Sequence, residues 1–414
     1  MRKADMNTGL DSAGRRPVLV VGAGPVGLTA ALALRSSGLP VTVLEAESED
    51  RVRPGSRALF LHRESLQLLG RIRPEVARSI ADHGVVWSTR RTLYRGREVF
   101  CRTYPPPPEG SVPPFTSLRQ VETERHLMRE CRAAGVEFAW DSEVVEVETT
   151  PEEVRLRTAA GAEWRADYVV AADGARSGVR RSLGIELRGE RSNAFHVVVD
   201  VEEDAADPLP LERVFHYEHP GLGGRSVMRV PFAGGFQLDL QCKDDDDPDE
   251  YASEDAVRRW MARVVPARYA DRLLWVSRYR FLKVVAEAFT DRNRRVLLVG
   301  ESCHLFPPFG ARGLNSGIAD AVAAASAVTE ALEQPGTRET AVDRFAHQRR
   351  EAAVFNSRAA GVALDHLRPR SRTRRLGQSV AARLAPLVPA CGAWLEYAPY
   401  GPRTGAATNP GGRY

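Results

Sequence analysis

Residues 17–46, PVLVVGAGPVGLTAALALRSSGLPVTVLEA, decide the fold. The run 17–21 is apolar without alternation, which is typical of a strand buried on both faces of a sheet. Residues 30–34 favour a helix that Gly38 ends, and the run 41–44 suits a second strand. The order strand, turn, helix, strand predicts one βαβ unit with a parallel sheet.

The turn of this unit carries the motif Gly22-x-Gly24-x-x-Gly27. Gly22 allows a tight turn, Gly24 lets a pyrophosphate approach the backbone, and Gly27 lets the helix pack closely on the strand. The helix N-terminus then offers unpaired N–H groups to the phosphates. Glu45 closes the second strand, where a carboxylate accepts hydrogen bonds from ribose hydroxyls. The motif therefore predicts dinucleotide binding, and it does not separate NAD from FAD.

The 414-residue chain has an ordinary globular composition, with 43% hydrophobic and 27% charged residues. This excludes a mainly disordered chain or a collagen-like rod, and no apolar run approaches the roughly 18 residues that cross a bilayer. The net charge of +4 is too small to indicate nucleic-acid binding. Five scattered cysteines form no CxxC pair, and no secretory signal is recognisable. We therefore expect a cytoplasmic protein without nucleic-acid or membrane partners.

Patterns along the rest of the chain predict its organisation. Residues 57–70 and 121–134 have the spacing of amphipathic helices, 136–172 carry recurrent strands, and 193–242 read as an antiparallel sheet. Residues 295–299 form another buried strand, so the chain returns to its first domain. The expected fold class is α/β: a Rossmann-like domain with a parallel sheet, interleaved with an antiparallel-sheet substrate domain and C-terminal helices. We expect a disordered leader at 1–16 and a flexible tail at 401–414. The nucleotide-binding domain is expected to be discontinuous, at 17–185 and 285–335, with part of 85–115 joining the other sheet. The substrate domain is expected at 186–284 and further helices at 336–400.

Two later segments place an acidic residue at the carboxyl end of a buried strand. Residues 167–180, DYVVAADGARSGVR, end their strand at Asp173 and Gly174. Residues 296–321, VLLVGESCHLFPPFGARGLNSGIADA, end theirs at Glu301, and a Pro-Pro loop, glycines and a helix follow. Because α/β sheets bind ligands at the carboxyl ends of their strands, both segments indicate parts of one binding site.

In this order, the three segments resemble those of the class A flavoprotein aromatic hydroxylases, and the resemblance covers nearly the whole chain. It implies a Rossmann-like FAD-binding domain with non-covalent FAD, and NADPH or NADH as a transient co-substrate without a Rossmann domain of its own. It further implies hydroxylation of a small aromatic, phenol-like or polycyclic substrate with O₂ through a flavin C4a-hydroperoxide, in a dry pocket. A role in secondary metabolism and a monomer or homodimer would fit this resemblance.

The resemblance also implies roles for single residues. Glu301 would bond the ribityl chain, while Pro307 and Pro308 would border the flavin ring and the substrate. A helix beginning near Asn315 would point its N-terminus at the flavin, and Arg312 would add positive charge there. Pro307, Pro308 and Arg312 are thus the catalytic candidates. The other expected FAD contacts are Arg57, Gln120, Asp173, Gly174, Gly313 and Leu314, beside Gly22, Gly24, Gly27 and Glu45.

One departure from the family pattern leaves alternatives open. Glu301 stands where the family usually has Asp, and its longer side chain either accepts from the ribityl hydroxyl after a small loop shift or weakens FAD binding. The alternative functions are an epoxidase or Baeyer–Villiger monooxygenase on the same scaffold, or a flavin-binding protein without turnover.

Substrate contacts are expected from polar residues on the antiparallel strands, although alternation places half of them on the outer face. The candidates are His196, His216, Tyr217, Arg229 and Gln237, with Phe309 from the Pro-Pro loop and Tyr397 and Tyr400 as capping or packing residues. Cys303 and His304 are adjacent, which is poor spacing for metal ligands, so packing and loop hydrogen bonds are expected there and no metal site.

Overall fold

The computed structural model describes residues 15–51, 59–369 and 371–402. Most of the predicted leader at 1–16 and of the predicted tail at 401–414, and also Arg57, lie outside the described residues. Arg16 is the first residue of strand β1 (Arg16–Val21), and Arg15 forms an ion pair with Asp167. The last two residues assigned to the leader are therefore attached to the sheet.

The first sheet has seven strands and is parallel at its centre, as the sequence predicts. Strands β7, β2, β1 and β10 lie side by side in parallel, β16 also pairs with β10 in parallel, and β9 and β8 continue the sheet antiparallel. Residues 18–21 of β1, all of β2 and all of β16 are buried without alternation, which fits their unbroken apolar runs, whereas β8 and β9 alternate between buried and exposed residues. The bounds are β2 (Val41–Leu44), β7 (Glu137–Ala139), β8 (Val144–Thr149), β9 (Val154–Thr158), β10 (Glu163–Ala171) and β16 (Val296–Leu298).

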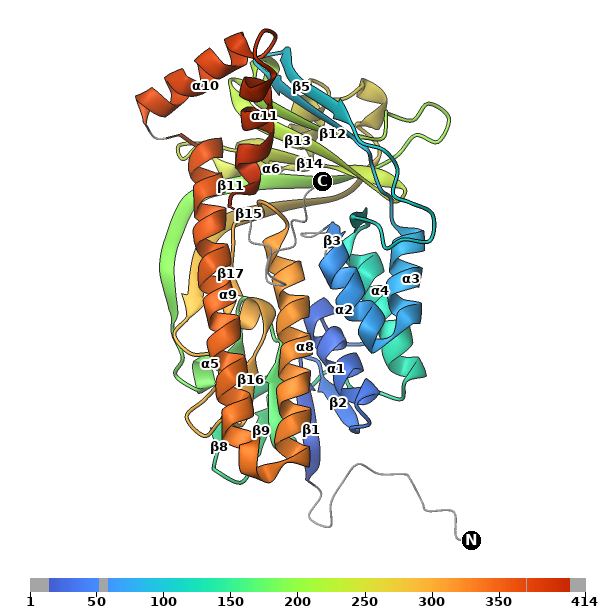
Figure 1. Ribbon diagram of the computed structural model, residues 1–414, viewed down its shortest axis with the longest axis vertical. Coiled ribbons are helices and arrows are strands. Elements are labelled where there is room, and N and C mark those ends of the chain that lie inside the picture. Colours follow the sequence, from blue (N-terminus) through green and yellow to red (C-terminus); the bar gives the residue numbers. More distant parts are fainter. Residues whose placement is uncertain (1–14, 52–58, 370, 403–414) are drawn as a thin grey trace.

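Helices α1, α4 and α8 pack together beside this sheet, and the long α9 lies along α8 (Figure 1). Alanines on the buried side of α8 allow this close approach, among them Ala321, Ala324 and Ala325. The helices of this half are α1 (Pro25–Ser36), α2 (Arg63–Ile72), α3 (Pro74–His83), α4 (Gln120–Ala133), α5 (Gly178–Ser182), α8 (Arg312–Glu333) and α9 (Arg338–Leu367).

The helix predicted at 57–70 is only partly right. Residues Phe60–His62 form strand β3, which pairs antiparallel with β6 (Phe115–Ser117), and α2 begins only at Arg63. The apolar spacing of this segment is compatible with a helix, and pairing with a distant strand overrides it.

The second sheet has eight strands and confirms the predicted antiparallel sheet. Its order is β17, β15, β11, β14, β13, β12, β4, β5, and only the β12–β4 pair is parallel. The long strands β11 and β15 pair along most of their length and connect the two halves of the molecule (Figure 1). The bounds are β4 (Thr89–Tyr94), β5 (Arg97–Thr103), β11 (Leu187–Glu202), β12 (Glu212–His219), β13 (Arg225–Phe232), β14 (Gly235–Gln241), β15 (Leu273–Ala286) and β17 (His304–Leu305).

Alternation along β11 separates the two faces of this sheet. Phe195, Val197 and Val199 pack into a core that also contains Trp260 of α7 (Glu254–Met261), which follows the short α6 (Pro248–Ala252). The residues between them therefore face the opposite side, toward the first domain.

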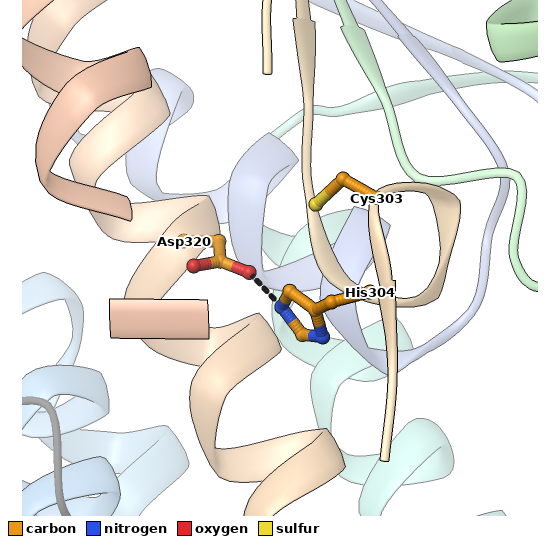
Figure 2. Close-up of side chains that lie close together, drawn as sticks. All are labelled: Cys303, His304 and Asp320. Carbon is orange, nitrogen blue, oxygen red and sulfur yellow. Dashed lines mark hydrogen bonds and ion pairs between the residues drawn. The ribbon is translucent and has the colours of Figure 1, made fainter. Parts of the chain in front are cut away.

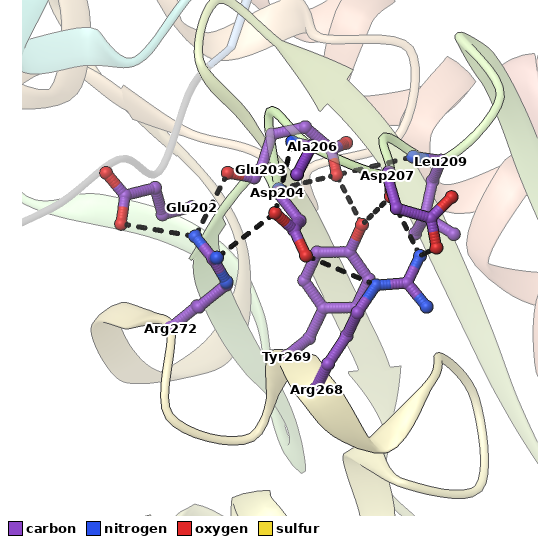
Figure 3. Close-up of polar contacts among 9 residues, drawn as sticks. All are labelled: Glu202, Glu203, Asp204, Ala206, Asp207, Leu209, Arg268, Tyr269 and Arg272. Carbon is purple, nitrogen blue, oxygen red and sulfur yellow. Dashed lines mark hydrogen bonds and ion pairs between the residues drawn. The ribbon is translucent and has the colours of Figure 1, made fainter.

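A polar cluster holds the loop between β11 and β12 (Figure 3). Arg268 forms ion pairs with Asp204 and Asp207, and Arg272 forms one with Asp204. The Tyr269 hydroxyl donates to Glu203, whose carboxylate also accepts from backbone N–H groups of the same loop. This cluster restrains the chain just before β12.

The C-terminal helices cover the far end of the second sheet. They are α10 (Arg372–Leu384) and α11 (Pro389–Tyr397), and α11 packs on β4 and β5. The Tyr217 hydroxyl of β12 donates to the Leu395 carbonyl at 2.7 Å, which attaches α11 to the sheet.

Candidate active site

The three motif glycines occupy different environments. Gly22 has a φ of +102°, and a Cβ there would lie 2.5 Å from the Ala172 carbonyl oxygen. A Cβ on Gly27 would lie 1.9 Å from the Gly22 oxygen, so helix α1 approaches the turn as closely as the backbone allows. A Cβ on Gly24 would meet no atom within 4 Å. The space in front of Gly24 is therefore open, at the N-terminus of α1, where a phosphate group fits.

Glu45 lies at the end of β2 beside this turn. Its carboxylate accepts from the Ala23 N–H at 2.6 Å and from the Glu47 N–H at 3.2 Å, and it pairs with Arg51. Burial alone would raise the pKa of Glu45, but Arg51 and the backbone N–H groups outweigh it and hold this pKa below its ordinary value. Glu45 is therefore an ionised acceptor beside the space in front of Gly24.

Asp173 follows the carboxyl end of β10. One carboxylate oxygen, Oδ2, accepts from the Val179 N–H at 3.0 Å. The other, Oδ1, is buried and has no hydrogen-bond partner among the described residues. Burial raises the pKa of Asp173, although hydrogen bonds from Ser177 and Val179 oppose the shift. An acceptor without a partner at this edge is the kind of group that a ligand satisfies.

The turn that carries Glu301 is held by contacts of the Asp320 carboxylate. Asp320 of α8 accepts from the Gly300 N–H at 3.1 Å. It also contacts His304 Nε2 at 2.6 Å, the contact drawn in Figure 2. Its second oxygen accepts from Arg349 at 2.6 Å. Burial would raise the pKa of Asp320, but Arg349 and His304 lower it overall, so Asp320 is ionised.

Cys303 and His304, with Asp320, form a group whose ligand atoms lie within 4.8 Å of one another. Burial raises the pKa of Cys303 well above its usual range, and the thiol donates to the Gly300 carbonyl at 3.3 Å. Both oxygens of Asp320 already accept hydrogen bonds, and the Arg349 guanidinium occupies one side. The arrangement therefore serves to hold the turn, and a cation would have to displace the guanidinium.

The Pro-Pro loop leads into α8 through Ala311, which has a φ of +51°. The helix begins at Arg312, three residues before the predicted start near Asn315. The first N–H groups of the helix therefore belong to Arg312, Gly313 and Leu314, all of which line the cavity described below. Asn315 instead joins elements: it accepts from the His62 N–H and the Ser65 hydroxyl and donates to the Phe60 carbonyl.

The Arg312 guanidinium has three partners that the sequence did not indicate. It donates to Asn356 Oδ1 at 2.7 Å and to the carbonyl oxygens of Tyr400 and Pro402 at 2.8 and 2.9 Å. The residue is only 2% exposed, so it is not a surface ion pair either. Its positive charge is thus committed to helix α9 and to the chain that follows α11.

A cavity of about 1010 Å³ joins the motifs to the second sheet, at the upper end of the roughly 300–1,000 Å³ of small-molecule and cofactor sites. It runs from the space in front of Gly24, past Pro308 and Phe309, to the inner face of the sheet. The predicted site residues that line it are Gly22, Gly24, Glu45, Gln120, Asp173, Gly174, Gln237, Glu301, Pro308, Phe309, Arg312, Gly313 and Leu314. Gly27, Pro307 and Asn315 are not among the described lining residues and lie behind it.

The end of the cavity at the second sheet carries two arginines that sequence reasoning missed. Arg213 of β12 and Arg90 of β4 are neighbours in register, and both line the cavity at 4% and 5% exposure. Arg213 pairs with Glu396 of α11, and Arg90 Nη1 lies 3.9 Å from the same carboxylate. Two cations therefore share one anion at this end. Tyr400, which accepts from Arg213 at 3.0 Å, also lines the cavity.

A second polar group lies on the same sheet face nearer the Pro-Pro loop. His196 Nδ1 of β11 contacts the Asp239 carboxylate of β14, both residues are buried, and Asp239 lines the cavity. The His196 ring packs edge-on against Phe309, with centroids 5.8 Å apart. Gln237 lines the cavity and donates to Asp200 at 2.9 Å. Of these residues, the sequence indicated His196 and Gln237, and it missed Asp239.

Four predicted substrate residues, His196, His216, Tyr217 and Arg229, are not among the described residues that line the cavity, and His196 reaches it only through Asp239 and Phe309. Alternation places His216 and Arg229 on the outer face: His216 accepts from the Gly96 N–H, and Arg229 lies 3.6 Å from Glu212. Burial lowers the pKa of His216 to about 4, with His219 adding to the shift. Tyr217 lies on the inner face, but α11 and His366 cover it. The Tyr397 hydroxyl contacts that of Tyr104, so this residue packs on the sheet.

Known proteins resemble this chain in sequence and in fold. It is 29% identical over 324 residues to a 3-(3-hydroxy-phenyl)propionate/3-hydroxycinnamic acid hydroxylase of Mycobacterium avium, covering 73% of this chain and 53% of that protein. It is 28% identical over 315 residues to a dialkyldecalin synthase of Streptomyces rugosporus, and the match covers 74% of this chain and 63% of that protein. The chain thus spans about half to two thirds of the length of these relatives.

The fold matches the crystal structure of p-nitrophenol 4-monooxygenase PnpA from Pseudomonas putida, with a TM-score of 0.75, 23% identity and coverage of 94% of this chain and 99% of that one. The family model described as FAD binding domain matches residues 15–358. That range contains all three motifs and the open space in front of Gly24. The chain therefore belongs to the FAD binding domain family, and the resemblance to class A flavoprotein hydroxylases that its motifs predict is confirmed.

Proposed function

We propose that this protein is an FAD-dependent monooxygenase that uses NAD(P)H and O₂ to hydroxylate an aromatic, phenol-like substrate. The observation that carries the proposal is the single cavity that joins the glycine turn to the inner face of the antiparallel sheet. An FAD site alone would need only the first half of that cavity. The second half, walled by buried side chains, supplies space for a substrate beside the cofactor.

We propose that residues 17–185 and 285–335 hold the cofactor, and that 186–284, with the part of 85–115 that joins the second sheet, bind the substrate. The open space before Gly24 receives the pyrophosphate, Glu45 accepts from the ribose, and Glu301 accepts from the ribityl chain. The N–H groups that begin α8 at Arg312, Gly313 and Leu314 face the ring. When bound, FAD supplies electron transfer and oxygen activation.

The substrate half of the cavity suggests what the substrate carries. Arg90 and Arg213 line the cavity there as two buried guanidinium groups beside Glu396, so this end suits an anionic substituent such as a carboxylate. Asp239, backed by His196, presents a carboxylate that accepts a phenolic hydrogen bond and takes the proton as the ring becomes electron-rich. Phe309 and Pro308 close the space between the two halves and exclude water.

The names of the relatives agree with this proposal and add one second candidate. The mycobacterial relative is named for hydroxylation of aromatic acids, and the structural neighbour for oxygenation of a nitrophenol. The Streptomyces relative is named as a synthase. A reaction on this scaffold without net oxidation is therefore the alternative that an assay has to separate.

The test uses FAD-loaded protein and a panel of phenols with and without a carboxylate. We expect one or more panel members to accelerate NADPH or NADH oxidation, and mass spectrometry with isotope-labelled O₂ to find one labelled oxygen atom in the product. The proposal is contradicted if every panel member gives only uncoupled NAD(P)H oxidation, in which peroxide forms and no labelled product appears. Conversion of a substrate without NAD(P)H would favour the synthase alternative.

A further inference from the structure

Helix α10 has one side buried against the protein and an apolar side that is exposed. On one side Gln378 and Ala381 are buried against the protein. On the other side Leu376, Val380 and Leu384 are 65%, 43% and 41% exposed. These three are spaced four residues apart, so their side chains lie along one line of the helix surface. The stripe continues past the helix with Leu387, which is 81% exposed. We call Leu376, Val380, Leu384 and Leu387 the α10 stripe.

The stripe is a concentration of exposed apolar residues. Eleven large hydrophobic residues are exposed in the described chain, and five of them lie between 376 and 388. Trp394 of α11, 43% exposed, is a sixth in the same C-terminal segment. Single exposed hydrophobic residues are common on proteins, but contiguous ones mark a surface that a partner covers.

The charge around the stripe indicates the chemistry of that partner. Residues 366–395 contain six arginines and no aspartate or glutamate. Arg372, Arg374, Arg375 and Arg383 of α10 are exposed, and none of them forms an ion pair with a described residue. Arg368, which precedes the helix, does pair with Asp244. The α10 stripe is therefore bordered by uncompensated positive charge.

We propose that α10 and the turn after it bind the surface of an anionic lipid bilayer. The stripe enters the boundary between headgroups and acyl chains, while the guanidinium groups stay at the phosphates on flexible stems. This is the pattern of a helix that lies in the plane of a membrane rather than across it. No helix in the described part of the chain is long and apolar enough to cross a bilayer.

A second copy of this chain fits the surface less well than lipid does. A symmetric dimer through α10 would bring two identical helices together. Each would carry the same unpaired arginines, and like charges face each other across such a contact. An anionic bilayer instead offers negative charge beside an apolar interior, which matches both features of the helix.

The position of α10 connects this surface to the cavity. The helix lies at the upper end of the long axis in Figure 1, far from β8 and β9. Two residues that flank α10 in the sequence line the cavity. They are Leu367, the last residue of α9, and Glu396 of α11. Binding through α10 would therefore bring the substrate end of the cavity close to the bilayer. The inference differs from the expectation from sequence that no membrane takes part.

The test is flotation of the full chain with vesicles of phosphatidylcholine alone or mixed with phosphatidylglycerol. We expect binding to the mixed vesicles only, weakening as salt is raised. Replacing Leu376→Ser with Leu387→Ser should remove most of the binding. The matched control is Leu211→Ser, a leucine 52% exposed on another surface, which should bind as the unchanged chain does.

Charge is tested separately. Arg374→Gln with Arg375→Gln should weaken binding to the mixed vesicles by about tenfold or more, whereas Arg292→Gln, exposed elsewhere, should not. Equal thermal unfolding of all variants excludes misfolding as the cause. The proposal is overturned if the unchanged chain ignores anionic vesicles at low salt, or if the stripe variants bind as well as it does. It is also overturned if the stripe instead mediates a concentration-dependent dimer that Leu376→Ser abolishes.

Discussion

Asp320, fully buried in α8, accepts a hydrogen bond from the backbone N–H of Gly300 at 3.1 Å. Through this contact the helix holds the turn that presents Glu301 to the cavity. Because Arg349 and His304 also bind Asp320, one carboxylate connects the third motif, α8 and α9. The geometry of the cofactor site therefore depends on a residue that does not line the cavity.

Asp320→Asn should destabilise the fold and lower FAD occupancy together. The change removes the negative charge and leaves Arg349 buried beside a neutral amide, which costs about 3–5 kcal/mol when a buried pair is broken. Urea unfolding and the flavin content of the purified protein measure the two effects. Asp343→Asn, which breaks an exposed pair with Arg294, is the control and should cost under about 1 kcal/mol. Equal stability of the two variants would contradict the role of Asp320.

Gly24→Val and Gly27→Ala should fail in different ways. A side chain at position 24 meets open space, so the variant should fold and yet purify without FAD, because the valine fills the phosphate position. A Cβ at position 27 would lie 1.9 Å from the Gly22 oxygen, so α1 must move, at a cost of about 3 kcal/mol or more. Thermal unfolding and absorbance of bound flavin separate the outcomes. Normal flavin content in Gly24→Val would place the pyrophosphate elsewhere.

Glu301 replacements test whether the carboxylate contacts the cofactor. Glu301→Asp should keep FAD occupancy, since it retains the charge at the position where the family usually has Asp. Glu301→Ala should weaken FAD binding by roughly tenfold or more, the effect of losing a hydrogen bond to a charged group of about 1.5–3 kcal/mol. Titration of apoprotein with FAD measures both. A loss in Glu301→Asp as large as in Glu301→Ala would mean that the turn requires the longer side chain.

Arg90→Gln should act on substrate choice. If Arg90 and Arg213 complete their cluster with a substrate anion, the KM for a carboxylate-bearing phenol should rise about tenfold or more, while that for a neutral phenol should change little. Arg102→Gln is the matched control, because Arg102 lies on the neighbouring strand and is exposed. Equal effects on both classes of phenol would show that Arg90 acts only on the packing of the site.

His366 should make the fold sensitive to mild acid. It is buried at 6% exposure, its Nε2 lies 3.1 Å from the Tyr217 hydroxyl, and burial with the nearby Arg374 lowers its pKa to about 4. Because the unfolded chain binds this proton near pH 6.5 and the folded chain only near pH 4, stability should be full above pH 6.5. It should fall as the pH drops between these values, by about 3 kcal/mol in total.

The variant His366→Gln should lose this part of the pH dependence, as measured by urea unfolding between pH 7 and pH 4. His347→Gln, with a side chain 74% exposed, is the control and should keep it. A slope that is the same in both variants would assign the acid sensitivity to other groups.

The local parts of the site could be predicted from the sequence because neighbouring residues determine them. The strand, glycine turn and helix of residues 17–46 depend on short-range sterics and on burial of an unbroken apolar run, and both are visible in the order of residues. The same holds for the acids that end β10 and β16, since a parallel strand presents its carboxyl end at one edge of the sheet. Alternation also indicated that 193–242 form a sheet with two different faces.

The tertiary structure alone decided which face of that sheet meets the cavity and what covers its far end. Alternation is the same on both faces, so it could not tell Arg213, which points inward, from His216 and Arg229, which point outward. Nor could it place Glu396 on Arg213, because the two residues are 183 positions apart and meet only when α11 packs on the sheet. In the same way, the sequence did not show that Arg312 binds the Tyr400 carbonyl after α11, since packing between distant segments, and not local spacing, chooses the partners of a buried charge.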